Sequence, residues 1–351
     1  MGIFLRNKRA PEQSKKRIFY KKRWFKVLAV IFILLIATGG FAAYKTGATL
    51  SKISTKDGFL ASLWKSLPGV GSDQLQGQKE GQINILLLGM RGVNMDGGGL
   101  LADTIMVAAI RPQENKVALI SIPRDLYVQD PGTSNHSKIN AVNAMYEGKG
   151  EGKGMETMKQ IVTEVTGLPI HYVVRLDFKG FTGLVDTVGG VDVYLDKPFS
   201  EPSQFEGESA ANFSLPAGKN HLNGEKALFF VRARYASSDF ERAKRQQQVL
   251  IALKDKLLSL GTLSDFGKAS NILNILGNDV RTDMDISEMK KAFDLSALIR
   301  DPQIKQKVFD TSPEGLLNSS KADTPEGKTY ILLPAGGNYD KIHEACQNIF
   351  Q

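Results

Sequence analysis

The sequence predicts an α/β domain in which helices cover both faces of a mixed β-sheet, with one transmembrane helix before it. Short continuous apolar runs, such as INILLLG at residues 83–89, are typical of strands that are buried on both faces. Helical stretches are interleaved with such strands through the segment that follows. An uncharged apolar run, VLAVIFILLIATGGFAA, occupies residues 27–43.

The positive charge is concentrated at the N-terminus. The 351 residues carry a formal charge of +8, and residues 1–26 alone contain ten Lys or Arg and one Glu, a net of +9. Residues 27–351 therefore carry about −1. Because the high pI belongs to the tail, it indicates no nucleic-acid partner.

Residues 27–44 are expected to form a single transmembrane helix. At 1.5 Å per residue, the apolar run with its aromatic flanks spans roughly the 30 Å hydrocarbon core of a bilayer. The basic residues before it are expected to stay in the cytoplasm. A cleaved signal peptide is the alternative, because small residues follow the run. The expected organisation is a basic cytoplasmic tail at 1–26, a transmembrane helix at 27–44, a membrane-proximal spacer at 45–80 and an extracytoplasmic domain at 81–351.

Apolar periodicity and turn residues place the elements of the outer domain in order. The PQEN turn joins two of the strands into a hairpin, and Pro123 ends the second of them. Strands are expected at 83–89, 103–111, 116–123, 172–176, 191–195, 307–310 and 330–333. Helices are expected at 141–146, 155–166, 178–187, 224–231, 240–260, 263–276, 286–299 and 339–350. The single cysteine, Cys346, has no partner for a disulfide.

The stretch FFVRARYASSDFERAKRQQQ at 229–248 concentrates basic residues at the start of the longest helix. Ser238 and Glu241 fit a capping box that begins this helix. Arg242 and Gln246 are then four residues apart and share one face, with Arg245 beside them. The same face continues with an apolar stripe, Val249, Leu253 and Leu257. The arginines are therefore expected to point toward the core side, into a cavity.

Converging guanidinium groups at a helix N-terminus are a phosphate-binding pattern. The first-turn N–H groups and the helix dipole favour an anion there, and planar guanidinium groups bind phosphate through two hydrogen bonds. Arg232 and Arg234 add two further cations just before the helix. The alternative is a solvated basic helix whose charges pair with Asp239 and Glu241.

A second charged group follows a strand in the stretch SIPRDLY. Pro123 stops the strand, so Arg124 and Asp125 emerge at a strand end, where open α/β sheets place their ligands. A loop ion pair is the alternative for these two residues. Asp103 begins the neighbouring strand and is a candidate magnesium ligand beside a phosphate, or else a cap of the preceding loop.

Taken together, SIPRD, LADT and RAR…DFERAKRQQ resemble the LytR-CpsA-Psr family of cell-wall glycopolymer ligases. KINAVNAMY, VDTVGGVDV and LNGEKAL support the resemblance, which covers residues 83–260. The resemblance implies an α-β-α sandwich that encloses a tunnel for a prenyl chain. It implies a phosphotransferase on the outer side of the bacterial cytoplasmic membrane that moves a glycan phosphate, such as teichoic acid, from a polyprenyl diphosphate carrier to a peptidoglycan hydroxyl, usually with Mg²⁺.

The resemblance also implies roles for individual residues. Asp103 is implied as a magnesium ligand, and Asp125 or Asp239 is a candidate to deprotonate the attacking hydroxyl. The residues expected to bind the diphosphate are Arg124, Arg232, Arg234, Arg242 and Gln246, with Arg245 and Lys138 as further candidates.

The sequence departs from the family pattern at the metal site. The family's first motif usually has an aspartate two residues after the glycine of LLLG, and that position is Arg91 here. The arginine usually found two residues before Asp103 is Leu101. Either Asp96 supplies the missing oxygen, or Arg91 neutralises phosphate directly and the metal is weaker or absent.

Two other functions remain open at this level. One is a non-catalytic polyprenyl-phosphate-binding or regulatory membrane protein, and the other is a polyprenyl diphosphate hydrolase that uses water as its acceptor. The four histidines are scattered without the spacing of a metal site, and no Walker loop, GxSxG elbow or HExxH helix is present.

Overall fold

The computed structural model describes residues 74–93, 99–202, 204–205, 212–260, 272, 276–296, 299, 301–324 and 327–351. The expected tail and transmembrane helix, most of the expected spacer, and Asp96 lie outside these ranges. Within them, no helix combines the length and apolar character needed to cross a bilayer. The boundaries expected for the four segments of the chain stay a prediction.

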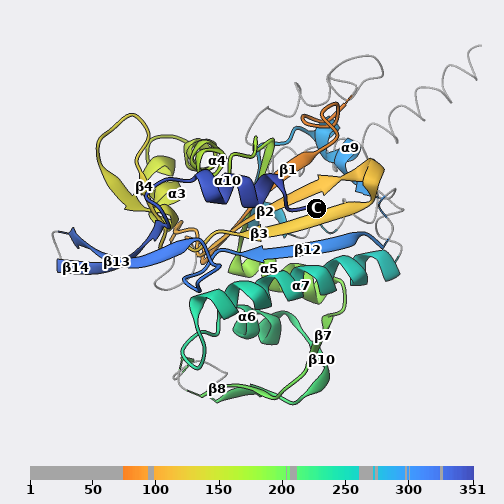
Figure 1. Ribbon diagram of the computed structural model, residues 1–351. Coiled ribbons are helices and arrows are strands. Elements are labelled where there is room, and N and C mark those ends of the chain that lie inside the picture. Colours follow the sequence, from red (N-terminus) through yellow and green to blue (C-terminus); the bar gives the residue numbers. More distant parts are fainter. Residues whose placement is uncertain are drawn as a thin grey trace, which may run out of the picture. The chain divides into compact units, whose positions relative to one another are not determined.

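A six-stranded mixed sheet forms the centre of the domain, in the order β11-β6-β1-β2-β3-β12 (Figure 1). Its strands are β1 (Ile83–Met90), β2 (Thr104–Arg111), β3 (Lys116–Ser121), β6 (Tyr172–Asp177), β11 (Val280–Thr282) and β12 (Gln303–Val308). β1 pairs antiparallel with β2 and parallel with β6, while β3 pairs antiparallel with β2 and parallel with β12. The expected α/β class with a central mixed sheet is confirmed.

One face of the sheet packs against α3 (Ile139–Glu147), α4 (Lys153–Thr166) and α10 (Asp340–Gln347) (Figure 1). Because strand side chains alternate between faces, Leu86 and Leu88 of β1 lie on this side. They belong to the same buried cluster as Met158 and Ile161 of α4 and Ile342 of α10. This cluster is the main hydrophobic core of the described residues.

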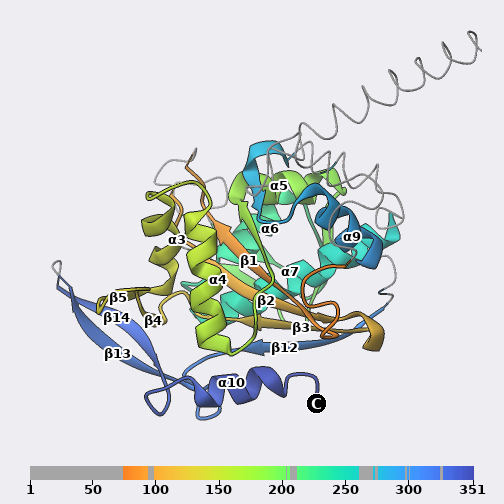
Figure 2. The same ribbon diagram turned by 90° about the horizontal axis from the view of Figure 1, so that it is seen from above.

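The opposite face is covered by α5 (Phe178–Thr187), α6 (Gly224–Arg232) and α7 (Asp239–Ser259). Two small hairpin-like sheets lie beyond these helices, namely β7 (Val191–Leu195) with β10 (Gly218–Leu222) and β8 (Phe199–Glu201) with β9 (Phe213–Leu215). They bury Phe205, Phe213, Phe229 and Phe230 in a second apolar cluster. In Figure 2, α4 lies in front of the sheet and α6 and α7 lie behind it.

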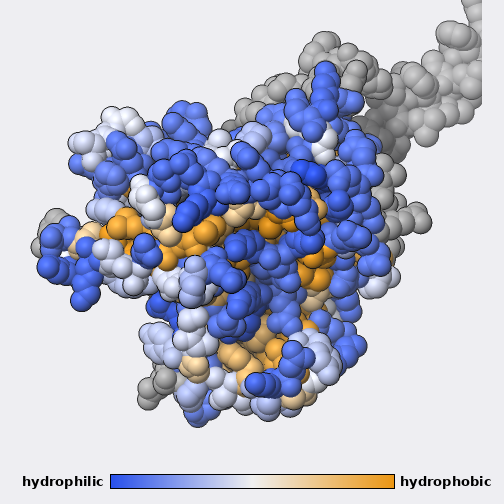
Figure 3. Space-filling view, in the orientation of Figure 1, coloured by the Kyte–Doolittle hydropathy of each residue, from blue (hydrophilic) through white to orange (hydrophobic). Residues whose placement is uncertain are grey.

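The remaining elements extend the domain at its ends. They are β4 (Tyr127–Gln129) with β5 (His136–Lys138), β13 (Leu317–Thr324) with β14 (Gly327–Pro334), and α9 (Ile286–Ser296). The β13–β14 arm is attached just before β4, where Leu332 N–H donates to Asp125 O at 2.9 Å. On the face seen in Figure 3, hydrophobic residues form a band across the middle of the domain, with hydrophilic residues around it. Lys305 and Lys307 lie on β12, the edge strand, as is common on protected sheet edges.

The expected strands and most of the expected helices are present with shifted ends, whereas β10, β13 and five short strands were not expected. The helix expected at 286–299 ends earlier, at Ser296, and most of the helix expected at 263–276 lies outside the described residues. The strands β4, β5, β8, β9 and β11 have three residues each. Three residues are too few to show the alternation by which a strand is recognised in a sequence.

A buried glutamine fastens α7 to the sheet. Gln247 is 1% exposed. Its Nε2 donates to Leu119 O at 3.2 Å, to Ser121 Oγ at 2.8 Å and to Lys307 O at 3.1 Å. These acceptors belong to β3 and β12, so one side chain ties the helix to two neighbouring strands. The paired residues of these strands are 187 positions apart in the sequence, since Ser121 is opposite Val308.

We expect Gln247→Ala to lower the free energy of unfolding by about 1–3 kcal/mol, because it leaves buried acceptors without a partner. Urea unfolding of the full chain, followed by circular dichroism, measures this change. Gln248→Ala is the matched control, since the neighbouring side chain is solvent-accessible and makes one hydrogen bond, to Tyr194 O at 2.7 Å. The control is expected to change the stability by less than about 0.5 kcal/mol. Equal effects of the two substitutions would contradict this account of how α7 is held.

Candidate functional site

An apolar cavity of about 400 Å³ lies between the sheet and the helices α5, α6 and α7. This volume is within the usual range of small-molecule sites, roughly 300–1,000 Å³. The apolar side chains that line it are Leu87, Met106, Val174, Leu176, Phe178, Phe181, Leu184, Leu228, Val231, Val249, Leu250 and Leu253. Leu87 of β1 lines this cavity, while Leu86 belongs to the core on the other side. The continuous apolar run of β1 therefore serves a core on one face and a cavity on the other.

Charged residues are gathered at one end of the cavity. Register places the end of β1, the start of β2 and the end of β3 at the same edge of the sheet, since Gly89 is opposite Thr104 and Met106 is opposite Ser121. Arg91, Asp103 and Arg124 follow or precede these strand ends. The arginines that line the cavity are Arg91, Arg124, Arg232, Arg234 and Arg242. We refer to these five side chains as the arginine cluster.

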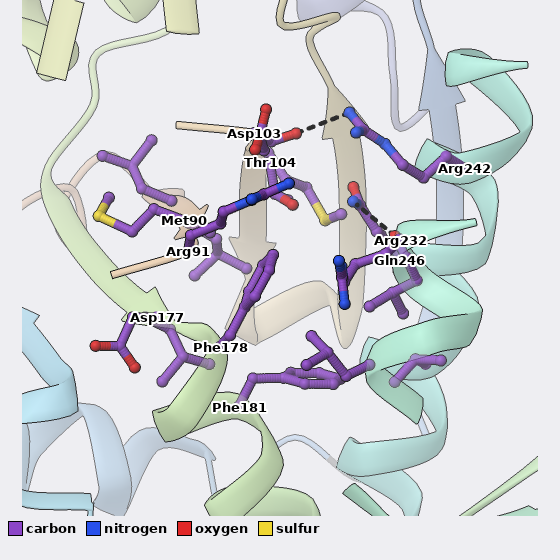
Figure 4. A pocket seen from close by; sticks show the side chains of 18 of the residues that line it. Met90, Arg91, Asp103, Thr104, Asp177, Phe178, Phe181, Arg232, Arg242 and Gln246 are labelled. Carbon is purple, nitrogen blue, oxygen red and sulfur yellow. Dashed lines mark hydrogen bonds between the residues drawn. The ribbon is translucent and has the colours of Figure 1, made fainter. Parts of the chain in front are cut away.

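The N-terminus of α7 lies at the charged end of the cavity, as the sequence predicted. Ser238 caps α7 by accepting a hydrogen bond from Glu241 N–H at 3.1 Å. Arg242 and Gln246 of the first two turns line the cavity, and Val249 and Leu253 continue the same face into its apolar part. Figure 4 shows Arg242 and Gln246 on α7 across the cavity from Arg91 and Asp103.

Arg124 and Arg242 are held by two shared carboxylates. Arg124 Nη1 lies 2.5 Å from Asp103 Oδ1, and its Nε lies 3.4 Å from Asp239 Oδ1. Arg242 Nη2 lies 3.1 Å from the Asp239 carboxylate and donates to the backbone oxygen of Asp103 at 2.9 Å. The two aspartates therefore connect the strand end to the first turn of α7.

Burial and charge shift the two guanidinium groups in opposite directions. Burial lowers the pKa of Arg124, but the charges of Asp103 and Asp239 outweigh it, so the pKa of Arg124 lies above its ordinary value. Arg242 is 6% exposed, and burial lowers its pKa because the nearby carboxylates do not fully compensate. Both groups stay charged at neutral pH. Arg242 Nε is also buried without a hydrogen-bond partner among the described residues, so an anion at this end would stabilise it.

Arg232 is the last residue of α6 and Arg234 lies in the turn after it. A residue that the sequence did not single out holds this turn. Gln204 Nε2 donates to Arg232 O at 2.8 Å, and Gln204 Oε1 accepts from Arg234 N–H at 2.6 Å. The guanidinium of Arg232 lies 5.1 Å from the ring centroids of both Phe178 and Phe205. Gln204 occurs outside any helix or strand, so no periodicity or motif indicates it.

Arg245 does not line the cavity, although it was expected to bind the diphosphate. Its guanidinium turns toward the end of α6, where it donates to Phe230 O at 3.0 Å, to Ala233 O and to Ser237 Oγ. Burial lowers its pKa to about 10. Successive helix residues are rotated by about 100°, so Arg245 is directed to α6 while Arg242 and Gln246 face the cavity. The structure gives Arg245 the role of a C-cap for α6.

Asp125 and Lys138 form a separate pair beside the cavity. Lys138 Nζ lies 2.7 Å from Asp125 Oδ1, and Arg124 Nε lies 3.9 Å from Asp125 Oδ2. Neither Asp125 nor Lys138 lines the cavity. Asp239 does not line the cavity either, but both of its arginine partners, Arg124 and Arg242, do. Asp96 lies outside the described residues.

Asp177 is a cavity-lining carboxylate that the sequence did not single out. It is the last residue of β6 and caps α5, accepting a hydrogen bond from Gly180 N–H at 2.8 Å. Burial raises its pKa, and the charge of Asp279 adds to this shift. The signal for it is the same as for Asp103, a carboxylate at a strand end.

The sequence matches the family described as LytR_cpsA_psr over residues 51–332. Polyisoprenyl-teichoic acid–peptidoglycan teichoic acid transferase TagU of Bacillus mycoides (strain KBAB4) is 31% identical over 271 residues, covering 77% of this chain and 81% of the relative. The protein of the same name from Oceanobacillus iheyensis (strain DSM 14371 / CIP 107618 / JCM 11309 / KCTC 3954 / HTE831) is 33% identical over 289 residues, covering 80% of this chain and 82% of the relative.

Solved structures show the same fold. The crystal structure of B. subtilis TagV is similar with a TM-score of 0.57 at 28% identity, over 76% of this chain and 96% of that chain. A structure titled "TagT bound to LIIa-WTA" is similar with a TM-score of 0.58 at 23% identity, over 81% of this chain and 96% of that chain. The expected family is confirmed, and this chain belongs to the LytR_cpsA_psr family.

Proposed function

We propose that this protein is a membrane-anchored phosphotransferase that moves a glycan phosphate from a polyprenyl diphosphate carrier to a hydroxyl of peptidoglycan. The observation that carries the proposal is that five arginines converge at one end of a single apolar cavity. The names of the relatives, which are teichoic acid transferases that act between polyisoprenyl-teichoic acid and peptidoglycan, support it. Teichoic acid is accordingly the glycopolymer that we propose.

The apolar part of the cavity fits the prenyl chain. Each CH₂ equivalent that leaves water contributes roughly 0.8 kcal/mol, so several isoprene units give a carrier substantial affinity. Phe178, Phe181 and Leu184 of α5 face Val249 and Leu253 of α7 across this space. We propose that these walls, together with the sheet, enclose the chain in an α-β-α arrangement.

The arginine cluster fits the diphosphate. Planar guanidinium groups form paired charge-assisted hydrogen bonds with phosphate oxygens, and the N-terminus of α7 adds its dipole. Arg124 is held in place by Asp103 and Asp239, so little conformational freedom is lost when it binds the anion. Phosphoryl transfer depends mainly on such positioning and charge neutralisation.

The proposed reaction needs one bond to form and one to break at the same phosphorus. An oxygen of a peptidoglycan hydroxyl attacks the phosphorus that carries the glycan, and the bond from that phosphorus to the bridging oxygen breaks. Polyprenyl monophosphate leaves, and its developing charge is stabilised by the arginine cluster. The hydroxyl proton passes to a carboxylate, for which Asp239 is better placed than Asp125 because its two partners, Arg124 and Arg242, both line the cavity.

The membrane anchor is part of the same proposal. Residues 27–44 would cross the bacterial cytoplasmic membrane with residues 1–26 in the cytoplasm. The apolar length of the run and its basic flank support this orientation. An anchored domain on the outer side has access both to a lipid carrier in the membrane and to peptidoglycan.

We expect Arg124→Lys to lower the rate of glycan transfer by about 10- to 100-fold, because lysine keeps the charge but loses the paired hydrogen bonds, each worth about 1.5–3 kcal/mol to a charged partner. The assay uses the full chain in detergent, a polyprenyl diphosphate-linked teichoic acid precursor and peptidoglycan oligomers, with mass spectrometry of the products. Arg111→Lys is the matched control, since Arg111 forms an ion pair with Glu114 at the other end of β2.

The products of the wild-type protein separate the alternatives. Attachment of the phosphoglycan to peptidoglycan supports the transferase. Release of the phosphoglycan into water without attachment would identify a hydrolase, and binding of the precursor without any product would identify a non-catalytic lipid-binding protein. Equal rates for Arg124→Lys and the wild type would remove the role proposed for Arg124.

We expect Leu250→Trp to discriminate between carriers by chain length. The larger side chain fills part of the cavity that Leu250 lines, so a long polyprenyl chain has less apolar volume to occupy. Transfer from a long-chain precursor is expected to fall by about tenfold or more, which corresponds to roughly two lost CH₂ equivalents. Transfer from a precursor with a chain of two or three isoprene units is expected to change less. Parallel losses with both precursors would show that the chain does not occupy this cavity.

A further inference from the structure

The described residues do not fit the magnesium ion that the resemblance implies. No group of three or more His, Cys, Asp or Glu side chains in the described part of the chain is arranged to hold a metal ion. The carboxylates that line the cavity are Asp103 and Asp177. Asp103 Oδ1 is engaged by Arg124 at 2.5 Å, and Asp177 Oδ1 caps α5. Figure 4 shows the Asp177 carboxylate apart from Asp103 and directed away from it.

The charge balance of the cavity lining favours an anion. Among the residues that the structure describes, the lining contains five arginines and two aspartates, a formal excess of three positive charges. Asp239, which pairs with Arg124 and Arg242 beside the cavity, lowers this excess to +2. A divalent cation would add to the positive excess, whereas the diphosphate of a lipid would offset it. Mg²⁺ sites beside phosphates normally rely on one or two carboxylates that are available as ligands.

Arg91 is placed to add positive charge on the sheet side of this site. It directly follows β1, and the next residue, Gly92, exchanges two backbone hydrogen bonds with Gly99, at 3.1 and 3.2 Å. The backbone at Arg91 is therefore fixed between a central strand and a closed loop base. Its side chain extends toward Asp103 and Thr104, across the cavity from Arg242 (Figure 4). Guanidinium groups thus reach the same space from the sheet and from α7.

Asp103 has a different task in this arrangement. Its carboxylate holds the Nη1 end of Arg124, and its backbone oxygen accepts from Arg242. Both contacts orient arginines toward the cavity. Asp103 is therefore a positioning residue for the arginine cluster.

We propose that the cavity binds the diphosphate of its lipid through guanidinium charge without a divalent cation, and that Arg91 supplies the charge on the sheet side. The inference rests on the proposed function, because it takes a prenyl diphosphate as the ligand. It also concerns this chain in particular, since a carboxylate at position 91 would make the same site more suitable for a cation and less suitable for an anion.

The test is the affinity of the full chain in detergent for geranylgeranyl diphosphate, measured by isothermal titration calorimetry in EDTA and in millimolar Mg²⁺. For the wild type we expect dissociation constants that agree within about twofold in the two buffers. Arg91→Asp is expected to weaken binding in EDTA by about 10- to 100-fold, in keeping with a lost charge-assisted hydrogen bond and a new repulsion. Mg²⁺ is expected to restore part of the affinity of this variant.

Two further variants serve as controls. Arg91→Lys keeps the charge, so it is expected to bind within about fivefold of the wild type in EDTA. Lys305→Asp makes the same change of charge as Arg91→Asp on the exposed edge strand β12, and it is expected to bind as the wild type does. Thermal unfolding curves of all variants show whether each is folded.

The outcomes separate this inference from the function on which it rests. Loss of wild-type binding in EDTA by more than about tenfold, with recovery in Mg²⁺, would overturn the inference while leaving the proposed function intact. Unchanged binding by Arg91→Asp in EDTA would also overturn it. Absence of wild-type binding in both buffers would overturn the proposed function itself.

Discussion

The structure of the site depends on the pairing of Arg124 with Asp103 and Asp239. A guanidinium group whose side chain is 15% exposed needs nearby negative charge, because burial alone disfavours its charged form. The two carboxylates provide this charge, and Asp239 also holds Arg242 at the start of α7. Without these contacts the end of β3 and the first turn of α7 would present cations to one another across a narrow space. The pairing therefore makes it possible to bring basic residues from distant parts of the chain together.

The cluster remains positive because the paired carboxylates are fewer than the arginines. Asp103 and Asp239 pair with Arg124 and Arg242, and the described lining also contains Arg91, Arg232 and Arg234. The faces of Phe178 and Phe205 support Arg232, and such contacts position a cation without neutralising it. This excess of arginines is the property on which the proposed anion site depends.

Much of this site could be predicted from the sequence because its residues lie on long, regular elements. The capping box at Ser238 set the start of α7, and helical spacing then placed Arg242 and Gln246 on the cavity face. Helical spacing does not decide whether Arg245 faces the cavity, because this residue lies at the border of that face. In the structure its side chain turns to the carbonyl groups at the end of α6. Gln204 was not predicted, because a residue in an irregular segment acts through backbone contacts that only the folded chain brings near.

In the fold too, the long regular elements could be predicted from the sequence and the short strands could not. The apolar runs of β1, β2 and β3 predicted a buried sheet, but they did not reveal that one face of β1 borders a cavity, since apolar residues line cores and lipid-sized cavities alike. The short strands β4 and β5 and the hairpin of β8 and β9 have too few residues to show alternation. Their positions are set by partners elsewhere in the chain, such as the pairing of Tyr127 with Lys138.

In the proposed site, the helix α7 fixes how a lipid phosphate lies in the cavity. Arg242 and Gln246 occupy its first two turns, and Val249, Leu250 and Leu253 follow on the next turns of the same side. Along a helix, the change from cationic to apolar lining therefore takes place within about one turn, or 5.4 Å. A ligand with a charged head and an apolar chain satisfies both parts in one orientation only, with its phosphates at the arginine end. The apolar walls and the arginine cluster thus act as one site, because binding of the chain determines where the phosphorus is presented to an acceptor.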